Sequence, residues 1–396
     1  MSVLPETVLQ FGAGNFLRAF CDLFIQQANE GATPVGKIVV VQSTDSGRAD
    51  ALSAQNGRYH VAVRGVRNGQ VVDESFPVEA ISRAVSARSD WPAVLELARS
   101  PQLRYLLSNT TEAGFALQPA DRPTDSPPAS FPAKLCQVLA ARQSVGLPGL
   151  IILPCELIER NGDRLKELVL QQAAAWAETA PQYASSAFLE YVQHGCRWLN
   201  SLVDRIVTGK PAEHPLLASD PLLTAAEPFA LWAIEGTAAD LGPLVHPAIR
   251  VVPDVQPYSL RKIRILNGAH TALVSQALPL GFQTVREAVA DKAVGDWLRG
   301  LLNEEIIPLL RGRVDDPDQF ARDTLDRFAN PFLNHRLSDI ALNHAAKLKT
   351  RLLPTWKEWL AQGQHPPRLE QLLQQQVAAG HLAASDLDSG DRTASS

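Results

Sequence analysis

Cysteine is scarce in this chain, which has only four among its 396 residues. Cys21, Cys136, Cys155 and Cys196 stand far apart, and none forms the C-x-x-C spacing of a zinc or redox site. We therefore expect no metal site. We expect buried free thiols instead, as is usual in the reducing cytoplasm.

Long apolar runs and blocks of like charge are also lacking. No stretch is long enough to span a bilayer, and the first residues lack the basic segment and apolar run of a secretory signal. The net charge of −5 is spread over mixed acidic and basic residues, without the basic stripe that binds nucleic acid. The sequence thus predicts a cytoplasmic protein that has neither a membrane nor a nucleic acid as partner.

Up to about residue 255, short apolar runs alternate with helical periodicity, as in parallel sheets that are buried on both faces. Strands are expected at 8–11, 37–42, 103–109, 149–156, 229–236 and 249–255, and a hairpin is expected over 58–66 and 69–84. Helices are expected after residue 15 and over 91–100, 131–143, 161–178 and 187–207. From Pro257 onward the periodicity is helical only.

These patterns predict an α/β protein with two domains. A Rossmann-like N-terminal domain with a mostly parallel sheet is expected over 1–255, and an all-helical domain over 256–384. The small, polar residues 385–396 are expected to form a disordered tail.

The stretch FGAGNFLRAF follows a predicted strand and opens a predicted helix, with Gly12 and Gly14 in G-x-G spacing. In dinucleotide-binding folds the first glycine allows the tight turn and the second lets the backbone approach the pyrophosphate. Leu17 stands where the third glycine of this fingerprint is expected. The turn therefore predicts a dinucleotide site, and an ordinary strand–helix turn is the alternative.

The end of the second predicted strand, VVVQSTDSGR, bears on the choice of cofactor. In such folds an acidic residue at this point binds the ribose of NAD, whereas an arginine accommodates the 2′-phosphate of NADP. We expect Gln42 or Asp45 to bind the ribose, with Arg48 as the alternative partner of a 2′-phosphate. NAD(H) is favoured because no basic residue adjoins the strand end, and NADP(H) stays open.

The stretch KIRILNGAH, residues 262–270, places three polar residues in an otherwise apolar helical pattern. At 100° per residue, Asn267 lies about 140° from Lys262, with His270 between them. The three side chains then project to one side of the helix. A solvated lysine and a structural histidine are the alternative interpretation.

The spacing K-x4-N-x2-H resembles the catalytic motif of the mannitol dehydrogenase family of polyol-specific long-chain dehydrogenases. FGAGNFLRAF resembles the modified glycine fingerprint of the same family. Further similar stretches follow in order over nearly the whole chain: SNTTEAG, SFPAKL, ILPCELIERNG, NSLVDRIVTG, AEPFALWAIEG and NPFLNHRLSDIALN. They resemble the members that interconvert D-tagaturonate and D-altronate in hexuronate breakdown.

The resemblance implies hydride transfer between a nicotinamide and a secondary alcohol or ketone, without a metal. It implies that Lys262 is the acid/base, that Asn267 and Asn161 donate to the substrate oxygen, and that His270 positions the substrate or the lysine. Asp204 is implied to orient a neighbour or relay protons, and a structural aspartate is an equal alternative.

The cofactor site implied by the resemblance and by strand-end positions comprises Phe11, Gly12, Ala13, Gly14, Asn15, Phe16, Gln42, Asp45, Asn109, Thr110 and Glu112. The expected cofactor is NAD(H). The expected assembly is a monomer or a small homo-oligomer.

The substrate is expected to be a sugar acid, whose carboxylate calls for a cation. The candidate cations are Arg18, Arg64, Lys134 and Arg327. Mannitol dehydrogenases often carry a glutamate three residues before the lysine, where this chain has Ser259, so their proton route and substrate are not assumed. Fructuronate/mannonate, fructose/mannitol and a non-catalytic nucleotide-binding module are the alternatives.

Overall fold

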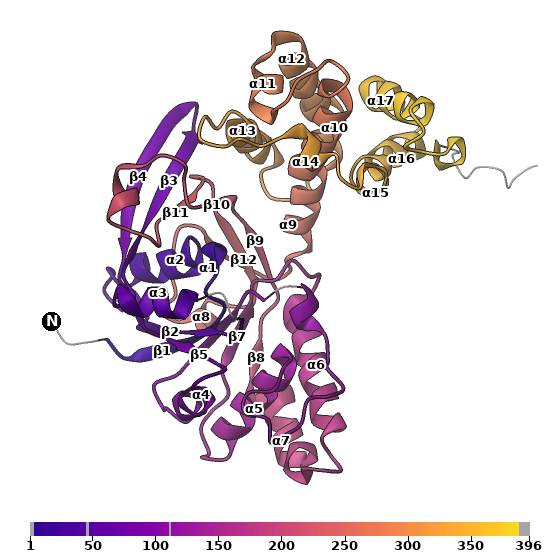
Figure 1. The fold of residues 1–396 in the computed structure, drawn as a ribbon. Coiled ribbons are helices and arrows are strands. Elements are labelled where there is room, and N and C mark those ends of the chain that lie inside the picture. The colour runs from indigo at the N-terminus through magenta and orange to yellow at the C-terminus, as the bar shows by residue number, and fades with distance from the viewer. Residues whose placement is uncertain (1–3, 45–46, 111, 388–396) are drawn as a thin grey trace, which may run out of the picture. The chain divides into compact units, whose positions relative to one another are not determined.

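The computed structural model describes residues 4–44, 47–110 and 112–387 (Figure 1). The chain divides into two compact units. The N-terminal unit comprises 1–63, 74–226 and 230–255, and the C-terminal unit comprises 64–73, 227–229 and 256–396.

The main sheet of the N-terminal unit has six strands, all parallel, in the order β5-β2-β1-β6-β7-β8. The strands are β1 (Glu6–Phe11), β2 (Lys37–Gln42), β5 (Ile81–Ser86), β6 (Tyr105–Ser108), β7 (Ile151–Pro154) and β8 (Arg197–Trp198). Along the chain this is the 3-2-1-4-5-6 order of the doubly wound dinucleotide-binding fold, which reverses between β1 and β6. The Rossmann-like prediction is confirmed.

Helices cover both faces of this sheet (Figure 1). One face carries α1 (Asn15–Arg18), α2 (Cys21–Ala28) and α3 (Arg48–Ala54), and the other carries α4 (Trp91–Ala98), α5 (Phe131–Gln143) and α6 (Asn161–Ala175). Successive side chains of a strand point to opposite faces. In β1, Val8 accordingly belongs to one core and Leu9 and Phe11 to the other.

The single helix expected after the glycine turn is broken in two. It is interrupted at Phe20, whose backbone angles of φ −132° and ψ −92° are not helical. The Phe20 ring packs against Phe24 and Trp232, with centroids 4.6 and 5.7 Å apart. The break lets this ring enter the core, and it leaves α1 only four residues long.

Two smaller sheets complete the part of the chain before residue 255. Their strands are β3 (Tyr59–Arg67), β4 (Gln70–Val78), β9 (Ser201–Asp204), β10 (Val207–Gly209), β11 (Thr224–Ala226), β12 (Leu231–Glu235) and β13 (Ile249–Val252). Their orders are β10-β11-β3-β4 and β13-β12-β9. A short helix, α8 (Ala238–Leu241), follows β12.

Two predictions about this region are wrong. Residues 81–84 were expected to continue a hairpin strand, but they begin β5, because Ile81 and Val85 are buried in the opposite cores of the main sheet. A helix was expected over 187–207. Only α7 (Ser186–Glu190) and a π-helical turn (Tyr191–Gly195) are helical, and β8, β9 and the start of β10 follow. Pairing with β7 and β12 outweighs the local periodicity there.

From Gln256 onward, the described part of the C-terminal unit is helical, as predicted, and α10 packs against most of the other helices there. Its helices are α9 (Gln256–Arg261), α10 (Gly268–Ala277), α11 (Val285–Ala290), α12 (Lys292–Gly300), α13 (Pro317–Phe328), α14 (Leu337–Ile340), α15 (His344–Arg351), α16 (Leu353–Ala361) and α17 (Pro367–Ala378). Helix α10 packs against α11, α12, α14, α15 and α17. Nine of its ten residues are buried, so it forms the core of this unit.

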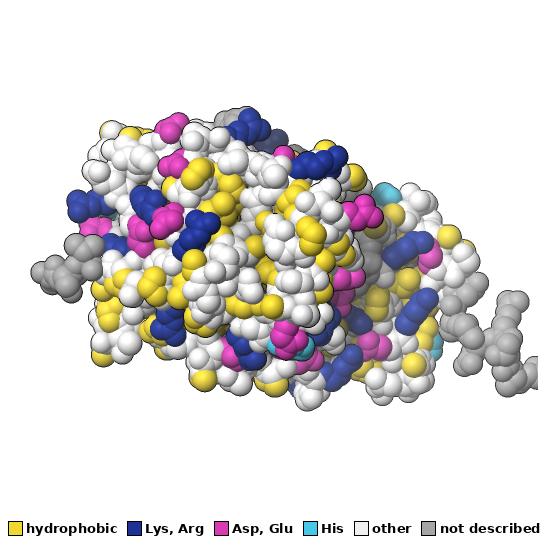
Figure 2. Space-filling view, turned by 90° about the horizontal axis from the view of Figure 1, so that it is seen from below, with side chains coloured by type: hydrophobic (Ala, Val, Ile, Leu, Met, Phe, Trp, Pro, Cys, Tyr) yellow, Lys and Arg dark blue, Asp and Glu magenta, His cyan; other side chains and the backbone are white. Residues whose placement is uncertain are grey.

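The surface mixes charges of both signs. Figure 2 shows Lys and Arg side chains interspersed with Asp and Glu side chains over one face, without a large area of one charge. Among the described residues, no helix is both long enough and apolar enough to cross a membrane.

One carboxyl group of α2 is buried in the core of the N-terminal unit. Asp22 on α2 is fully buried, and its Oδ2 lies 3.2 Å from the hydroxyl oxygen of Tyr59. Burial raises the pKa of Asp22 to about 7, although hydrogen bonds from Tyr59 and Gln10 and the charge of Arg18 act in the opposite direction. The folded protein therefore holds this proton over a pH range in which the unfolded chain has lost it.

This carboxyl group should make stability depend on pH. The pKa of this group is about 3.9 in the unfolded chain and about 7 in the folded protein. Below pH 4 the group is protonated in both states and does not change stability with pH. Between pH 4 and pH 7 the free energy of unfolding falls by roughly 4 kcal/mol in all. Asp22→Asn should remove this loss. Urea unfolding measured from pH 4 to pH 8 should show that the free energy of unfolding of the variant, relative to that of the wild type, increases with pH. The same substitution at exposed Asp50 is the control, and equal pH slopes for wild type and Asp22→Asn would contradict the prediction.

Candidate functional site

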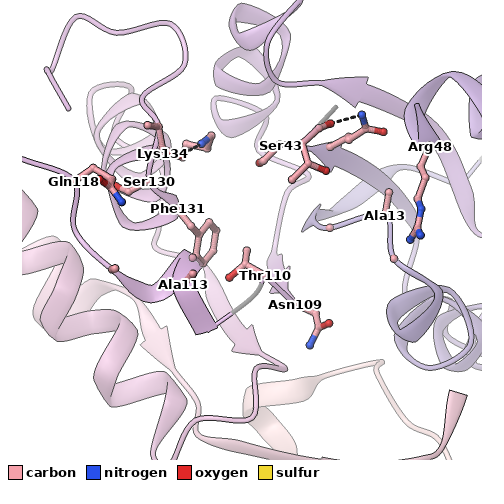
Figure 3. Close-up of a pocket in the computed structure, with 17 residues that line it drawn as sticks. Ala13, Ser43, Arg48, Asn109, Thr110, Ala113, Gln118, Ser130, Phe131 and Lys134 are labelled. Carbon is pink, nitrogen blue, oxygen red and sulfur yellow. Dashed lines mark hydrogen bonds between the residues drawn. The ribbon is translucent and has the colours of Figure 1, made fainter. Parts of the chain in front are cut away.

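A cavity of about 500 Å³ lies at the carboxyl ends of β1, β2 and β6, where the strand order reverses (Figure 3). Ligands of doubly wound folds bind at this place. Four segments line the cavity: the glycine turn (12–14), the end of β2 with the start of α3 (42–44 and 48), the end of β6 (109–110), and parts of the segment 113–134.

The glycine turn has the shape that a close-bound ligand requires. Gly12 has φ +124°, and a Cβ there would lie 3.0 Å from Leu17 Cδ1 and 3.1 Å from the Asn109 carbonyl oxygen. Leu17, which replaces the third glycine of the fingerprint, thus packs against the first one. Above Gly14 the space is open, since a Cβ there would meet only Arg48 Nη1 at 3.6 Å. The turn therefore fits a dinucleotide backbone.

The end of β2 presents hydroxyl groups and one guanidinium group to the cavity. Gln42 lines the cavity, but its side-chain amide is hydrogen-bonded to the backbone of the protein. Its Oε1 accepts from the Ala49 N–H at 2.6 Å, and its Nε2 donates to the Thr44 carbonyl. Its side chain thereby holds the turn into α3. Ser43, Thr44 and Arg48 also line the cavity. Asp45, the other residue expected to bind the ribose, lies outside the described residues.

The end of β6 is fixed by a carboxylate that the sequence patterns did not single out. Glu156, which follows β7, is buried and accepts hydrogen bonds from the Thr110 N–H at 2.7 Å and from the Ser108 hydroxyl at 3.1 Å. The Asn109 amide donates to the Cys155 carbonyl at 2.7 Å. Burial raises the pKa of Glu156, and the hydrogen bonds from Thr110 and Ser108 oppose that shift. These contacts hold Asn109 and Thr110 in the cavity wall.

The wall formed by 113–134 was also missed as a cofactor site, although its long proline-rich loop marks it as a segment of functional interest. It contributes small residues, the Phe131 ring, and polar groups at Gln118, Ser130 and Lys134. Phe131 packs on Phe11, with centroids 5.1 Å apart.

Six of the eleven predicted cofactor residues line the cavity, namely Gly12, Ala13, Gly14, Gln42, Asn109 and Thr110. Phe11, Asn15 and Phe16 do not. Phe11 is a core residue beneath Phe131, Phe16 stacks on Phe20, and the Asn15 amide oxygen accepts from Arg18. Glu112 begins a short 3-10 helix, and its side chain lies outside the described part of the structure.

In the C-terminal unit, the expected polar helix runs from α9 into α10 through a π-helical turn over Lys262–Asn267. Hydrogen bonds in a π turn join residues i and i+5, and such turns often occur at functional sites. Lys262 and Asn267 are five residues apart. The angle between their side chains about the helix axis is therefore smaller than the 140° of a regular α-helix. This corrects the angle expected from the sequence.

The three polar residues of this helix differ in their surroundings. Lys262 and Asn267 are half-buried, and no side-chain hydrogen bond of Asn267 is formed within the described part of the chain. His270 is buried, with its ring centroid 4.2 Å from that of Phe328 and 4.9 Å from that of His335. The Asn267 amide is thus available to a ligand, whereas the His270 ring is held between two other rings.

Asn161 does not have the surroundings of a substrate-binding amide. It is completely buried, and its Nδ2 donates to the carbonyls of Pro154, Glu156 and Ser201 at 3.0–3.1 Å. Its Oδ1 accepts from the N–H groups of Gly162 and Ser201. These hydrogen bonds tie the start of α6 to β7, to Glu156 and to β9, and they are the basis for a proposed structural role beside the oxyanion role that the resemblance implies.

The next three candidate residues, Asp204, Arg18 and Arg327, are buried. Both arginines bind groups of the protein itself. Asp204 is a buried residue at the end of β9. Arg18 donates to the Leu222 carbonyl, and Arg327 forms a buried two-pronged ion pair with Glu227, at 2.8 and 2.9 Å. Within the described residues, no group of three or more His, Cys, Asp or Glu side chains is arranged to hold a metal ion.

A further cation, Arg64, pairs with Asp73 at 2.9 Å, and its guanidinium lies 4.1 Å from the centroid of the Phe332 ring. The fourth candidate, Lys134, lines the cavity of the N-terminal unit.

A parallel doubly wound sheet with an open glycine turn is the arrangement of proteins that bind a dinucleotide. Two family models match the chain: the mannitol dehydrogenase Rossmann domain over residues 6–244 and the mannitol dehydrogenase C-terminal domain over residues 254–380. The chain belongs to the mannitol dehydrogenase family of CH–OH oxidoreductases, which confirms the resemblance seen in the sequence.

Among similar curated proteins, the altronate oxidoreductase of Bacillus subtilis (strain 168) is 40% identical over 380 residues, which cover 92% of this chain and 78% of that protein. The altronate oxidoreductase of Klebsiella pneumoniae (strain 342) is 39% identical over 384 residues, with the same coverage of both chains.

Two solved structures share the fold. D-sorbitol dehydrogenase in its substrate-free form has a TM-score of 0.81 at 23% identity, covering 94% of this chain and 79% of that one. The ternary complex of Pseudomonas fluorescens mannitol 2-dehydrogenase with NAD and D-mannitol has a TM-score of 0.70 at 21% identity, covering 93% and 78%.

Proposed function

We propose that this protein interconverts D-tagaturonate and D-altronate with NAD(H), in the cytoplasm, without a metal. Relatives named altronate oxidoreductase, which are 39–40% identical over 92% of the chain, support this substrate pair. The observation that carries the chemistry is the π turn, which places Lys262 and the available amide of Asn267 one turn apart on one helix.

The cavity of the N-terminal unit is the proposed cofactor site. Gly12 and Gly14 would face the pyrophosphate, and Ser43 and Thr44 offer hydroxyl groups to the ribose. Asn109 and Thr110, fixed by Glu156 and Cys155, would line the path across the carboxyl ends of β1 and β6. When bound, the nicotinamide supplies or accepts the hydride.

Lys262 is the proposed acid/base. In the reducing direction its ammonium gives a proton to the ketone oxygen, and in the oxidising direction the neutral amine removes the hydroxyl proton. Asn267 donates its amide to the same oxygen, where negative charge develops before the proton arrives. Their half-buried positions limit competition from water for both contacts.

Parallel assays test this proposal. NADH and NADPH oxidation should be followed with D-tagaturonate, D-fructuronate and D-fructose, and tagaturonate with NADH should have the highest kcat/KM. Turnover of fructose without turnover of tagaturonate would assign a neutral ketose instead. If none of the three is reduced although NADH binds, the chain is a binding module. Faster oxidation of NADPH than of NADH would overturn the cofactor assignment.

A further inference from the structure

Lys134 stands in the first turn of α5 and lines the cavity on the wall opposite the end of β2 (Figure 3). The residue is only 4% exposed. Its ammonium donates one hydrogen bond, to the Ala129 carbonyl at 2.6 Å. An ammonium carries three hydrogens. No other hydrogen bond or ion pair of this group forms within the described part of the chain, so a buried cation faces the cavity with donors to spare.

Asp121, whose charge acts on Lys134, does not use these donors. Asp121 accepts from the N–H groups of Ala129 and Ser130, at 2.5 and 3.1 Å, and from the Ser130 hydroxyl at 2.5 Å. It thereby fixes the start of α5 and supplies a compensating charge. Burial lowers the pKa of Lys134 to about 8; the charge of Asp121 opposes this shift, and that of Arg88 adds to it. A buried ammonium in this state gains from any acceptor that a ligand brings.

The wall around Lys134 suits a flat, mostly apolar group. Ala113, Ala116 and Ala129 are small, and Phe131 adds an aromatic ring. Polar groups at Gln118, Ser130 and Lys134 are the exceptions. A purine has apolar faces and acceptor nitrogens along its edges. The composition of this wall therefore matches a base rather than a sugar or a phosphate.

The other cation of the cavity is placed for the phosphates. Arg48 Nη1 lies 3.6 Å from the Cβ position of Gly14, the residue expected beside the pyrophosphate. Arg48 and Lys134 come from opposite walls in Figure 3. With the phosphates and the ribose directed to the glycine turn and the end of β2, the wall of 113–134 is left for the adenine.

We propose that Lys134 binds the adenine ring of the cofactor by donating a hydrogen bond from its ammonium to a ring nitrogen. This rests on the proposed function, and it moves Lys134 from the cations considered for the sugar-acid carboxylate to the cofactor site. Gln118 and Ser130 complete the polar edge of the adenine wall.

The test is Lys134→Met in the full chain, with binding measured by calorimetry. Loss of a charged hydrogen bond should weaken ADP-ribose and NADH about 10- to 100-fold. Reduced nicotinamide mononucleotide, which lacks adenosine, should bind the variant as it binds the wild type. In turnover the KM for NADH should rise, whereas kcat at saturating NADH and the KM for tagaturonate should stay unchanged. Lys210→Met, at an exposed lysine outside the cavity, is the matched control.

Three outcomes overturn the inference: unchanged affinity for ADP-ribose, a raised KM for tagaturonate with unchanged NADH affinity, or a loss that is larger for 2′-phospho-ADP-ribose than for ADP-ribose. If Lys134→Met does not fold, Lys134→Gln, which keeps a donor for the Ala129 carbonyl but removes the charge, should weaken ADP-ribose in the same direction by a smaller factor, and unchanged affinity in that variant also counts against the inference.

The inference and the proposed function fail separately. A wild-type protein that binds ADP-ribose but reduces none of the sugars contradicts the function alone. If the wild-type protein reduces tagaturonate but Lys134→Met binds ADP-ribose with normal affinity, only the inference about Lys134 is contradicted.

Discussion

Lys262→Met should lower kcat for tagaturonate reduction by about 10²- to 10⁴-fold, the usual contribution of a positioned acid/base. Methionine keeps much of the length of the side chain and removes only the titrating group. The dissociation constant for NADH should change by less than about twofold, because the proposed cofactor cavity is lined entirely by residues of the N-terminal unit. Stopped-flow measurement of NADH oxidation and calorimetry of NADH binding provide the two readouts.

Lys292→Met is the matched control, since this lysine lies on α12 of the same unit with a 92% exposed side chain. It should leave kcat and stability unchanged. Near-normal turnover by Lys262→Met would refute the role of Lys262. A parallel loss of NADH affinity would show that the substitution disturbs more than the proton transfer.

Asn161→Ala should lower the free energy of unfolding by about 4 kcal/mol, a large effect for one substitution. Five hydrogen bonds to backbone groups are lost, and each buried group left without a partner costs about 1–3 kcal/mol before any relaxation. Urea unfolding followed by circular dichroism measures the loss. The kcat of the fraction that remains folded should be close to that of the wild type.

Asn267→Ala should behave in the opposite way, which makes it the natural partner experiment. Its side chain forms no hydrogen bond within the described residues, so stability should change by less than about 1 kcal/mol while kcat falls about 10²- to 10³-fold. If Asn161→Ala proves stable but inactive, the oxyanion role implied by the family resemblance is restored, and the structural role is refuted.

The sequence was sufficient for four of the six strands of the main sheet, β1, β2, β6 and β7, and for the glycine turn. The continuous apolar run 38–41 is typical of a strand buried on both faces, as in parallel sheets, and Gly12 with Gly14 marks the turn from the first strand into a helix. These signals are local. They survive in the folded protein because the contacts around them act in the same direction.

Features that depend on residues far away in the sequence could not be predicted from local patterns. The stretch 197–207 has helical periodicity, yet most of it forms strands because its backbone pairs with β7, β11 and β12. Asn161 resembles a functional asparagine in its motif, and only the three-dimensional structure shows that its amide is used by the backbone of β7 and β9. The lining of the cavity by 113–134 likewise depends on how an irregular loop folds back over the sheet.

The π turn has a consequence for how the C-terminal unit can change. It adds one residue to a turn, so everything after Asn267 is rotated by about 100° from the direction that an unbroken helix would give it. The face of α10 that packs into the core is therefore out of phase with the face of α9. Substitutions that refit α10 to its neighbours need not turn the amine of Lys262. The core of this unit can therefore diverge while the proposed acid/base keeps its direction.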